Sequence, residues 1–316
     1  MDAAPRAIPG LAALARSYDG FLVDLWGVIH DGAAAFPEAV ATLAQLAAAG
    51  KRVVILSNAP RLSGAARARL RALGVEDRLY ATLITSGDAV RAALRHRDTP
   101  FYAALGRRYR FLGKPEDEAV LEGLGYSPVP TVADADFVLA SGLAVGPHGP
   151  RSVADYEGVL EAAAAQREPR ANDGSVPAAA ARGLPMVCAN PDLAVVHGGA
   201  REDCAGTLAA RYAALGGRVA YEGKPWPRVY RMALAALGVA DRRRVLAVGD
   251  GLATDIAGAA AAGLPRCSSP AASSPPAGPP RAPPRPTPRC SPRRWPRPPS
   301  PPPSPPPPSR GEAGCG

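Results

Sequence analysis

Lysine, aromatic residues and long apolar stretches are all scarce in this chain of 316 residues. Only three of the 37 basic residues are lysines, at positions 51, 114 and 224, and aromatic residues make up 5% of the chain. No apolar run approaches the roughly 18 residues that a transmembrane helix needs, so we expect no membrane partner. The early acid Asp2 and the lack of a long apolar block beside it argue against a secretory signal.

Cysteine is also scarce, and its placement is uneven. Three of the five cysteines lie after residue 265, and the rest of the chain has only Cys188 and Cys204. Two cysteines cannot form a disulfide framework, which predicts a reduced, cytoplasmic compartment. No group of cysteines and histidines has the spacing of a zinc site.

Positive charge is concentrated at one end of the chain. The formal net charge is +9, but residues 266–316 contain eight arginines, no lysine and a single acid, Glu312. The remainder is therefore close to neutral, and we expect no nucleic-acid partner. With 47% apolar and 21% charged residues, the chain fits a globular protein of about two domains.

The segment 266–316 differs in kind from the residues before it. It holds 20 of the 37 prolines and shows no apolar periodicity, so we predict a disordered Pro/Arg-rich tail. The tail could be a linker or a polyproline ligand for an SH3-like domain. We favour a third interpretation, a frameshift in a G+C-rich gene, because the composition changes abruptly at Leu264-Pro265.

Three short apolar runs alternate with amphipathic helical stretches in the rest of the chain. This alternation predicts an α/β fold with a parallel sheet. The strands are expected at 21–23, 53–56 and 245–248, and the helices after them at 37–49, 61–73 and 252–263. Ligands bind at the carboxyl edge of such sheets, so the polar strand ends predict a site built from Asp24, Ser57 and Asp250.

The stretch from about 86 to 215 interrupts this repeat and is long enough for a second α/β unit. Its strand candidates are 101–104, 136–140 and 185–188. We therefore predict a discontinuous core domain (18–88 and 216–265), an inserted cap domain (89–215) and the tail (266–316).

Three aspartates are the candidate metal ligands. Asp250 ends a strand and Asp255 lies in the first turn of the next helix, so their carboxylates can converge. Such hard oxygen ligands suit Mg²⁺. Asp24, at a strand end, fits a nucleophile or a metal ligand. The structural alternatives are that Asp24 closes a turn and that Asp255 complements a helix dipole.

Two further groups could contact an anion. Ser57 and Asn58 can donate hydrogen bonds at a helix start, or simply cap that helix before Pro60. Lys224, in the tripeptide Gly-Lys-Pro, can keep a neighbouring carboxylate ionised and screen phosphate charge. The same tripeptide contains Lys114, but acidic residues follow it, and we predict Lys114 to be a surface residue.

Six segments together resemble a known family. The resemblance is to the haloacid dehalogenase superfamily of aspartyl-nucleophile hydrolases, and within it to the class IIA nitrophenylphosphatase-like branch. It covers about residues 20–265 and implies a Rossmann-like core with a cap inserted between the second and third motifs. The segments are DLWGVIHDG (24–32), ILSNAPR (55–61), LITSGDAV (83–90), CANPD (188–192), YEGKPWPRVY (221–230) and VGDGLATDIAGA (248–259).

The resemblance also implies roles for single residues and a reaction. The implied catalytic residues are Asp24 as nucleophile, Ser57 on the phosphoryl oxygens and Lys224 as the charge clamp. The implied Mg²⁺ ligands are Asp24, the backbone carbonyl of Trp26, Asp250 and Asp255. The substrate-binding residues are expected to be Ser57, Asn58, Asn190 and Asp192. The implied reaction is hydrolysis of a small phosphorylated metabolite, and a homodimer is the implied assembly.

Two features depart from the family pattern. Trp26 stands where the phosphatases usually carry a second Asp, the general acid/base. Three outcomes are open: activity restricted to good leaving groups, replacement by His30 or Asp31, or phosphometabolite binding with weak or no turnover; a non-phosphate hydrolase is a further alternative. The resemblance also implies a strand and helix after Gly263, and we expect the tail to supply neither.

Overall fold

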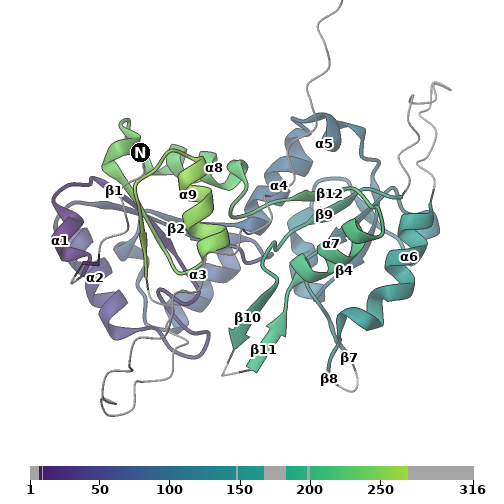
Figure 1. Cartoon of the computed structure of the whole chain (residues 1–316), viewed down its shortest axis with the longest axis horizontal. Coiled ribbons are helices and arrows are strands. Elements are labelled where there is room, and N and C mark those ends of the chain that lie inside the picture. The colour runs from purple at the N-terminus through teal and green to yellow at the C-terminus, as the bar shows by residue number, and fades with distance from the viewer. Residues whose placement is uncertain (1–6, 9, 147–148, 167–182, 198–199, 270–316) are drawn as a thin grey trace, which may run out of the picture. The chain divides into compact units, whose positions relative to one another are not determined.

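The first sheet of the molecule has five parallel strands in the order β14-β13-β1-β2-β3 (Figure 1). The computed structural model describes residues 7–8, 10–146, 149–166, 183–197 and 200–269, so the predicted disorder of 270–316 lies outside the described residues. The strands of this sheet are β1 (Gly20–Asp24), β2 (Arg52–Ser57), β3 (Thr82–Thr85), β13 (Val245–Gly249) and β14 (Arg266–Ser268).

Both faces of this sheet are buried, as the continuous apolar strands predict. Along β1, Phe21 and Val23 pack against α2 and α3, whereas Leu22 packs on the opposite face with residues of α8. The helices around the sheet are α1 (Ala12–Ala15), α2 (Pro37–Ala48), α3 (Ser63–Ala72), α4 (Ser86–His96), α8 (Pro227–Leu237) and α9 (Ala257–Ala261).

Local sequence sets where these helices begin. Pro37 and Pro227 occupy the first turns of α2 and α8, where a missing N–H costs nothing. Thr85 caps α4 by accepting from the Asp88 N–H, and the Asp88 carboxylate accepts from the Thr85 N–H in return. Each of these helices begins after a strand or loop at one edge of the sheet. Polar side chains gather at this edge.

A second sheet of five parallel strands has the order β12-β9-β6-β4-β5. Its strands are β4 (Arg108–Leu112), β5 (Ser127–Pro128), β6 (Phe137–Ala140), β9 (Met186–Cys188) and β12 (Val219–Tyr221). Helices α6 (Glu157–Ala165) and α7 (Ala205–Ala214) cover one face. The other face packs on α4, which also contacts the first sheet, and on α5 (Pro100–Ala104). The α/β architecture with an inserted second unit is confirmed.

Short elements complete the described chain. The two-stranded hairpins are β7 (Val145–Gly146) with β8 (Gly149–Pro150) and β10 (Ala194–His197) with β11 (Ala200–Asp203). The 3₁₀ turns are η1 (Asp77–Leu79), η2 (Pro115–Leu121), η3 (Val132–Asp134), η4 (Val153–Tyr156) and η5 (Arg242–Arg244), and a π-helical turn, η6, spans Leu252–Ile256.

The structure corrects three sequence-based expectations. The predicted strand 101–104 is helix α5, because Thr99 caps it and Pro100 occupies its first turn. Strand β12 pairs with β9 of the second sheet, although the predicted core domain resumes at residue 216. Residues 266–268 are not tail but strand β14, which pairs with β13 and supplies the edge strand that we expected to be missing.

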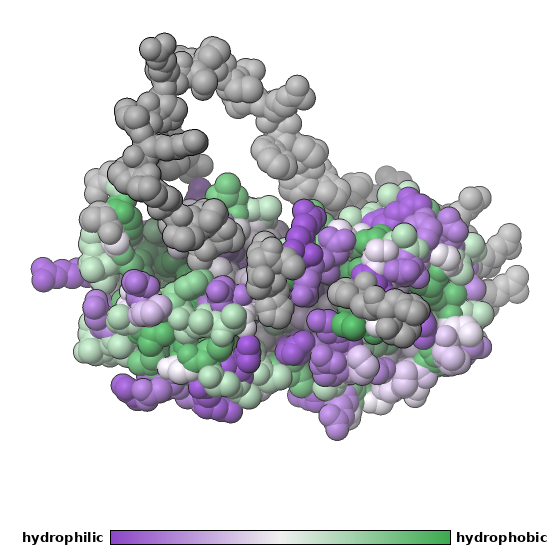
Figure 2. Space-filling view, turned by 90° about the horizontal axis from the view of Figure 1, so that it is seen from below, coloured by the Kyte–Doolittle hydropathy of each residue, from purple (hydrophilic) through white to green (hydrophobic). Residues whose placement is uncertain are grey.

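No helix in the described ranges is long and apolar enough to cross a membrane. Hydrophilic residues are numerous on the face shown in Figure 2, interspersed with hydrophobic ones.

Candidate active site

The polar ends of three neighbouring strands meet at one edge of the first sheet. Asp24 is the last residue of β1, Ser57 is the last residue of β2, and Asp250 directly follows β13. The chain runs from β1 outward to β2 and β3, then returns to β13 on the other side of β1. Asp24 and Asp250 therefore flank the point where the strand order reverses, the usual place for a ligand crevice.

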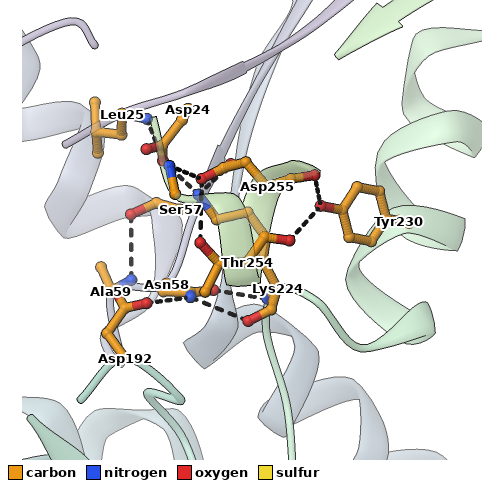
Figure 3. A network of polar contacts seen from close by, with 11 residues as sticks. Asp24, Leu25, Ser57, Asn58, Ala59, Asp192, Lys224, Tyr230, Thr254 and Asp255 are labelled. Carbon is orange, nitrogen blue, oxygen red and sulfur yellow. Dashed lines mark hydrogen bonds and ion pairs between the residues drawn. The ribbon is translucent and has the colours of Figure 1, made fainter. Parts of the chain in front are cut away.

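Lys224 lies at the centre of this edge and is 3% exposed. Its ammonium group donates to Oδ1 of Asp24 and, at 2.8 Å, to Oδ1 of Asp255 (Figure 3). The Leu25 N–H also donates to Oδ1 of Asp24, at 2.7 Å. These contacts fix the rotation of the Asp24 carboxylate.

The Asn58 side chain holds the backbone of Lys224 in place. Its Oδ1 accepts from the Lys224 N–H at 2.7 Å, and its Nδ2 donates to the Lys224 carbonyl at 3.2 Å. Nδ2 also donates to Oδ1 of Asp192 at 2.8 Å (Figure 3). Asn58 thus connects the end of β2 with the loop after β9 and the loop after β12.

A buried ionic network anchors the loop that carries Lys224. Glu222, 4% exposed, accepts from the Tyr102 hydroxyl and from Nε of Arg228, both at 2.9 Å. Arg228 in turn binds both carboxylate oxygens of Asp98, at 2.7 and 2.8 Å. Burial raises the pKa of Glu222, against the opposing charge of Arg228. The loop is tied on both sides, so Lys224 has little freedom to leave the carboxylates.

Asp24, Asp250 and Asp255 form a cluster that fits a metal ion. One carboxylate oxygen from each lies within 4.8 Å of the others. Two glycines give these carboxylates room: a Cβ at Gly27 would lie 2.2 Å from Oδ2 of Asp250, and one at Gly249 would lie 2.2 Å from Cγ of Asp255. An all-oxygen donor set of this kind suits a hard divalent cation such as Mg²⁺.

Asp255 is positioned by the π-helical turn η6 rather than by regular α-helix. Its Oδ2 accepts from the Gly251 N–H and the Thr254 hydroxyl, each at 3.3 Å. The Tyr230 hydroxyl donates to the carbonyls of Thr254 and Asp255, at 3.3 and 3.1 Å, which satisfies backbone groups that the irregular turn leaves available. Such turns are frequent at functional sites.

The electrostatics of the cluster are those of crowded, buried carboxylates. Burial raises the pKa of Asp24 well above its usual range, and the Asp255 carboxylate adds to this while Lys224 opposes it. Burial and the Asp255 charge likewise raise the pKa of Asp250. Burial alone would lower the pKa of Lys224, but the carboxylates of Asp24, Asp255 and Asp192 together raise it. A bound cation would favour the ionised carboxylates.

Trp26 is half-buried beside the site, and its ring meets that of His30 edge-on with centroids 5.1 Å apart. His30 is buried, and its Nδ1 accepts from the Gly32 N–H at 2.9 Å. Burial and the Arg69 charge lower the pKa of His30 to about 4, so the ring is neutral at pH 7. Asp31 accepts from the Ala33 and Ala34 N–H groups, both at 2.8 Å, which lower its pKa. Neither residue is therefore a protonated acid at neutral pH.

We expect the buried neutral His30 to make the fold sensitive to acid. Its pKa is about 4 in the folded protein and 6.5 in an unstructured chain, so only the unfolded protein takes up the proton between these values. The free energy of unfolding should fall by roughly 2–3 kcal/mol as the pH drops from 6.5 to 4. Urea unfolding at several pH values measures this, and His30→Gln should show a shallower decline. Parallel profiles for both proteins would contradict the assignment.

The remaining predicted residues line the same cleft, which has a volume of about 960 Å³. The Ser57 hydroxyl oxygen accepts from the Ala59 N–H at 3.1 Å, so its own proton is available to a ligand. Asn190 Oδ1 accepts from the Asp192 N–H at 3.1 Å. Burial raises the pKa of Asp192, against the Lys224 charge. The structure thus brings together the predicted residues, although Asn58, Asn190 and Asp192 also hold one another.

Sequence reasoning missed part of the cleft. Lys114 was predicted to be a surface residue, but it is half-buried and lines the cleft, because it follows strand β4. Asp117 and Ser141 line the cleft as well. Strand β4 has no clear apolar run to mark it, so the only available signal was Lys114 itself, one of three lysines in the chain.

Comparisons with known proteins agree with this geometry. A family model described as haloacid dehalogenase-like hydrolase matches residues 21–127, and a related HAD-hydrolase-like model matches residues 221–268. A comparison with curated proteins gives no significant match.

Solved structures provide matches over most of the chain. A haloacid dehalogenase-like hydrolase from Brucella suis 1330 is 31% identical, with a TM-score of 0.70, over 81% of this chain and 86% of its own. A glycerol phosphate phosphatase from Mycobacterium tuberculosis, in complex with magnesium, is 26% identical, with a TM-score of 0.56. The match covers 80% of this chain and 68% of that phosphatase. A p-nitrophenyl phosphatase from Archaeoglobus fulgidus is 21% identical, with a TM-score of 0.57. The match covers 79% of this chain and 85% of that phosphatase.

The fold, the three aspartates at the carboxyl edge of the first sheet and these matches define the class of protein. The chain belongs to the haloacid dehalogenase-like hydrolase family. Its second sheet is inserted between the segment that contains Ser57 and the segment that contains Lys224. That place is the one that the resemblance to the class IIA branch implies.

Proposed function

We propose that this chain hydrolyses small phosphomonoesters with Asp24 as the nucleophile and Mg²⁺ held by Asp24, Asp250 and Asp255. The observation that carries the proposal is the convergence of these three carboxylates within 4.8 Å, beside the buried Lys224. The backbone carbonyl of Trp26 is proposed as a further ligand, on the family resemblance. The ion would neutralise charge on the phosphoryl oxygens and on the carboxylates.

The chain's own residues divide the reaction between them. Leu25 and Lys224 hold Oδ1 of Asp24, so Oδ2 attacks phosphorus and the bond to the leaving alkoxide breaks. The Ser57 hydroxyl and the Lys224 ammonium stabilise the phosphoryl oxygens. Water then attacks the aspartyl phosphate, which releases inorganic phosphate and restores the Asp24 carboxylate. Positioning and charge compensation supply most of the rate.

The leaving group determines which esters this site can hydrolyse. The Trp26 indole N–H is far too weak an acid to act as a general acid, and His30 and Asp31 are not protonated acids at neutral pH. The departing alkoxide must therefore be stable by itself or take its proton from solvent. We propose that the chain acts best on esters of acidic alcohols; a binding role with little turnover is the second candidate, and Trp26 is the feature that favours it.

The testing experiment is hydrolysis of p-nitrophenyl phosphate, whose leaving group needs no general acid. Turnover should require Mg²⁺ and fall by at least about 100-fold in EDTA, since metal charge stabilisation is worth several kcal/mol. Asp250→Asn should raise the Mg²⁺ concentration needed for turnover, whereas Asp241→Asn, at a half-exposed acid outside the cleft, should not. No turnover by folded protein that still binds Mg²⁺ would favour the binding role.

A further inference from the structure

The chain passes between the two sheets twice, and charged side chains meet where it does so. Asp98 lies in the first connection, between α4 and α5, and Glu222 lies in the second, directly after β12. Arg228, in the first turn of α8, binds both of these carboxylates. One guanidinium group therefore joins the two connections, although Asp98 lies 130 residues before Arg228 in the chain.

The Arg228 side chain uses the planar fork of its guanidinium group for these contacts. Its terminal nitrogens donate to the two carboxylate oxygens of Asp98, at 2.7 and 2.8 Å, and its Nε donates to Oε1 of Glu222 at 2.9 Å. Arg228 is 8% exposed, and its guanidinium carbon lies 5.6 Å from the centre of the Tyr102 ring. A lysine could supply the charge but not these three bonds from one plane.

Glu222 has little else to hold its charge. Its two side-chain donors, Arg228 and the Tyr102 hydroxyl, both bind Oε1, and Oε2 accepts no hydrogen bond from the described residues. A buried carboxylate that loses its cation is strongly destabilised. Without Arg228, Glu222 must therefore take up a proton or move toward water, and a movement would displace the loop that begins at this residue.

The loop has no room to absorb such a movement before it reaches Lys224. The Glu222 carbonyl accepts from the Ser86 hydroxyl. Gly223 has a φ of 111°, and a Cβ there would lie 2.7 Å from Oδ1 of Asn58, so the backbone passes directly against that side chain. The same Oδ1 accepts from the Lys224 N–H at 2.7 Å. A shift of Glu222 is therefore passed on to Lys224, whose ammonium group lies between two carboxylates.

We propose that Arg228 is a positioning residue for the Lys224 ammonium group, that it acts through Glu222, and that Asp98 orients it. The inference rests on the proposed function, because it takes Lys224 to contact the phosphoryl group. Neither Arg228 nor Asp98 lines the cleft. Any effect of these two residues on phosphate binding must therefore pass through the loop.

The test is a double-mutant cycle between Arg228 and Lys224, measured by the binding of inorganic phosphate. Phosphate is titrated in saturating Mg²⁺ with the unmodified protein, Arg228→Gln, Lys224→Met and the double variant, and ³¹P NMR reports millimolar affinities. Arg228→Gln should weaken binding about 10-fold in the unmodified background but less than about 2-fold beside Lys224→Met, because coupled residues are not additive. Equal losses in both backgrounds, or no loss in either, would overturn the proposal.

Three further variants keep the test decisive if a member of the cycle does not fold. Arg228→Lys retains a charge beside Glu222 without the forked contact to Asp98, and it should recover part of the lost affinity. Asp98→Asn, at an exposed acid, should weaken phosphate binding several-fold. Glu157→Gln is the matched control, since it breaks the two contacts from Nε of Arg211, both at 3.0 Å, outside the cleft. A loss in Glu157→Gln as large as in Asp98→Asn would indicate general destabilisation and contradict the positioning role.

The positioning role and the proposed phosphatase activity can fail separately. Coupling of Arg228 to Lys224 in a folded protein that hydrolyses no phosphomonoester would support the positioning role and overturn the phosphatase activity. Unchanged kcat and KM in Arg228→Gln, in a protein that does hydrolyse p-nitrophenyl phosphate, would overturn the positioning role alone.

Discussion

Asp24→Asn should abolish Mg²⁺-dependent hydrolysis of p-nitrophenyl phosphate, lowering kcat on the order of 10⁴- to 10⁶-fold. The amide keeps the size of the carboxylate but cannot form the phosphoenzyme bond, and it removes one of the three proposed metal ligands. The measurement is steady-state release of p-nitrophenol in saturating Mg²⁺, with rapid mixing to detect a burst in the unmodified protein.

Folding must be checked in the same variant, because Asp24 is buried against Lys224. Replacing one member of a buried ion pair can destabilise a protein, so the thermal transition of Asp24→Asn is needed as a control. Lys224 retains Asp255 at 2.8 Å in that variant's starting geometry, which leaves it a partner. Residual activity within about tenfold of the unmodified protein would exclude Asp24 as the nucleophile.

Trp26→Asp should raise kcat/KM toward alkyl phosphates such as glycerol phosphate by about 10²- to 10⁴-fold, the usual contribution of a positioned general acid. The half-buried indole lines the cleft beside the cluster of carboxylates, so an acid at this position would lie near the leaving oxygen. The value of kcat/KM toward p-nitrophenyl phosphate should rise much less in this variant, because the leaving group of that substrate needs little protonation. Rates for both substrates, measured over pH 5–8, give the comparison.

Trp26→Asn is the matched control for this prediction. It removes the same ring contact with His30 and opens the same space, but it cannot donate a proton in the manner of a carboxylic acid. If Trp26→Asp and Trp26→Asn raise kcat/KM toward alkyl phosphates equally, the substitution acts by improving steric access rather than by proton transfer. If neither gains, the site lacks a productive pose for alkyl esters, which would favour the binding role.

The two sheets illustrate how far apolar periodicity predicts strands. Strands β1, β2 and β13 were predictable because each is a continuous apolar run with polar residues at its end, as buried parallel strands require. Strand β4, with the sequence RYRFL, alternates arginines with apolar residues and gave no such signal. The segment 101–104 is apolar enough to suggest a strand, but Thr99 and Pro100 start a helix there.

The edge strand β14 of the first sheet could not be predicted from the sequence, for a different reason. From composition alone, residues 266–268 belong with the proline-rich segment that follows them. In the structure they form β14 and pair in parallel with Ala247, Val248 and Gly249 of β13. A three-residue strand has almost no intrinsic preference, so its existence depends on the unpaired edge that β13 offers.

Residue types at strand ends were enough to predict a site built from Asp24, Ser57 and Asp250. The resemblance of six segments to a known family supplied the implied roles of these residues and of Lys224, and the class of hydrolase. Strand ends can be located from apolar periodicity, which is a local property of the chain. The long-range contacts became visible only in three dimensions: Asn58 clamps Lys224 across 166 residues of chain, and Lys114, Asp117 and Ser141 share a cleft with Asp24. Such contacts depend on strand order and on the insertion of one sheet within another, and neither leaves a local pattern in the sequence.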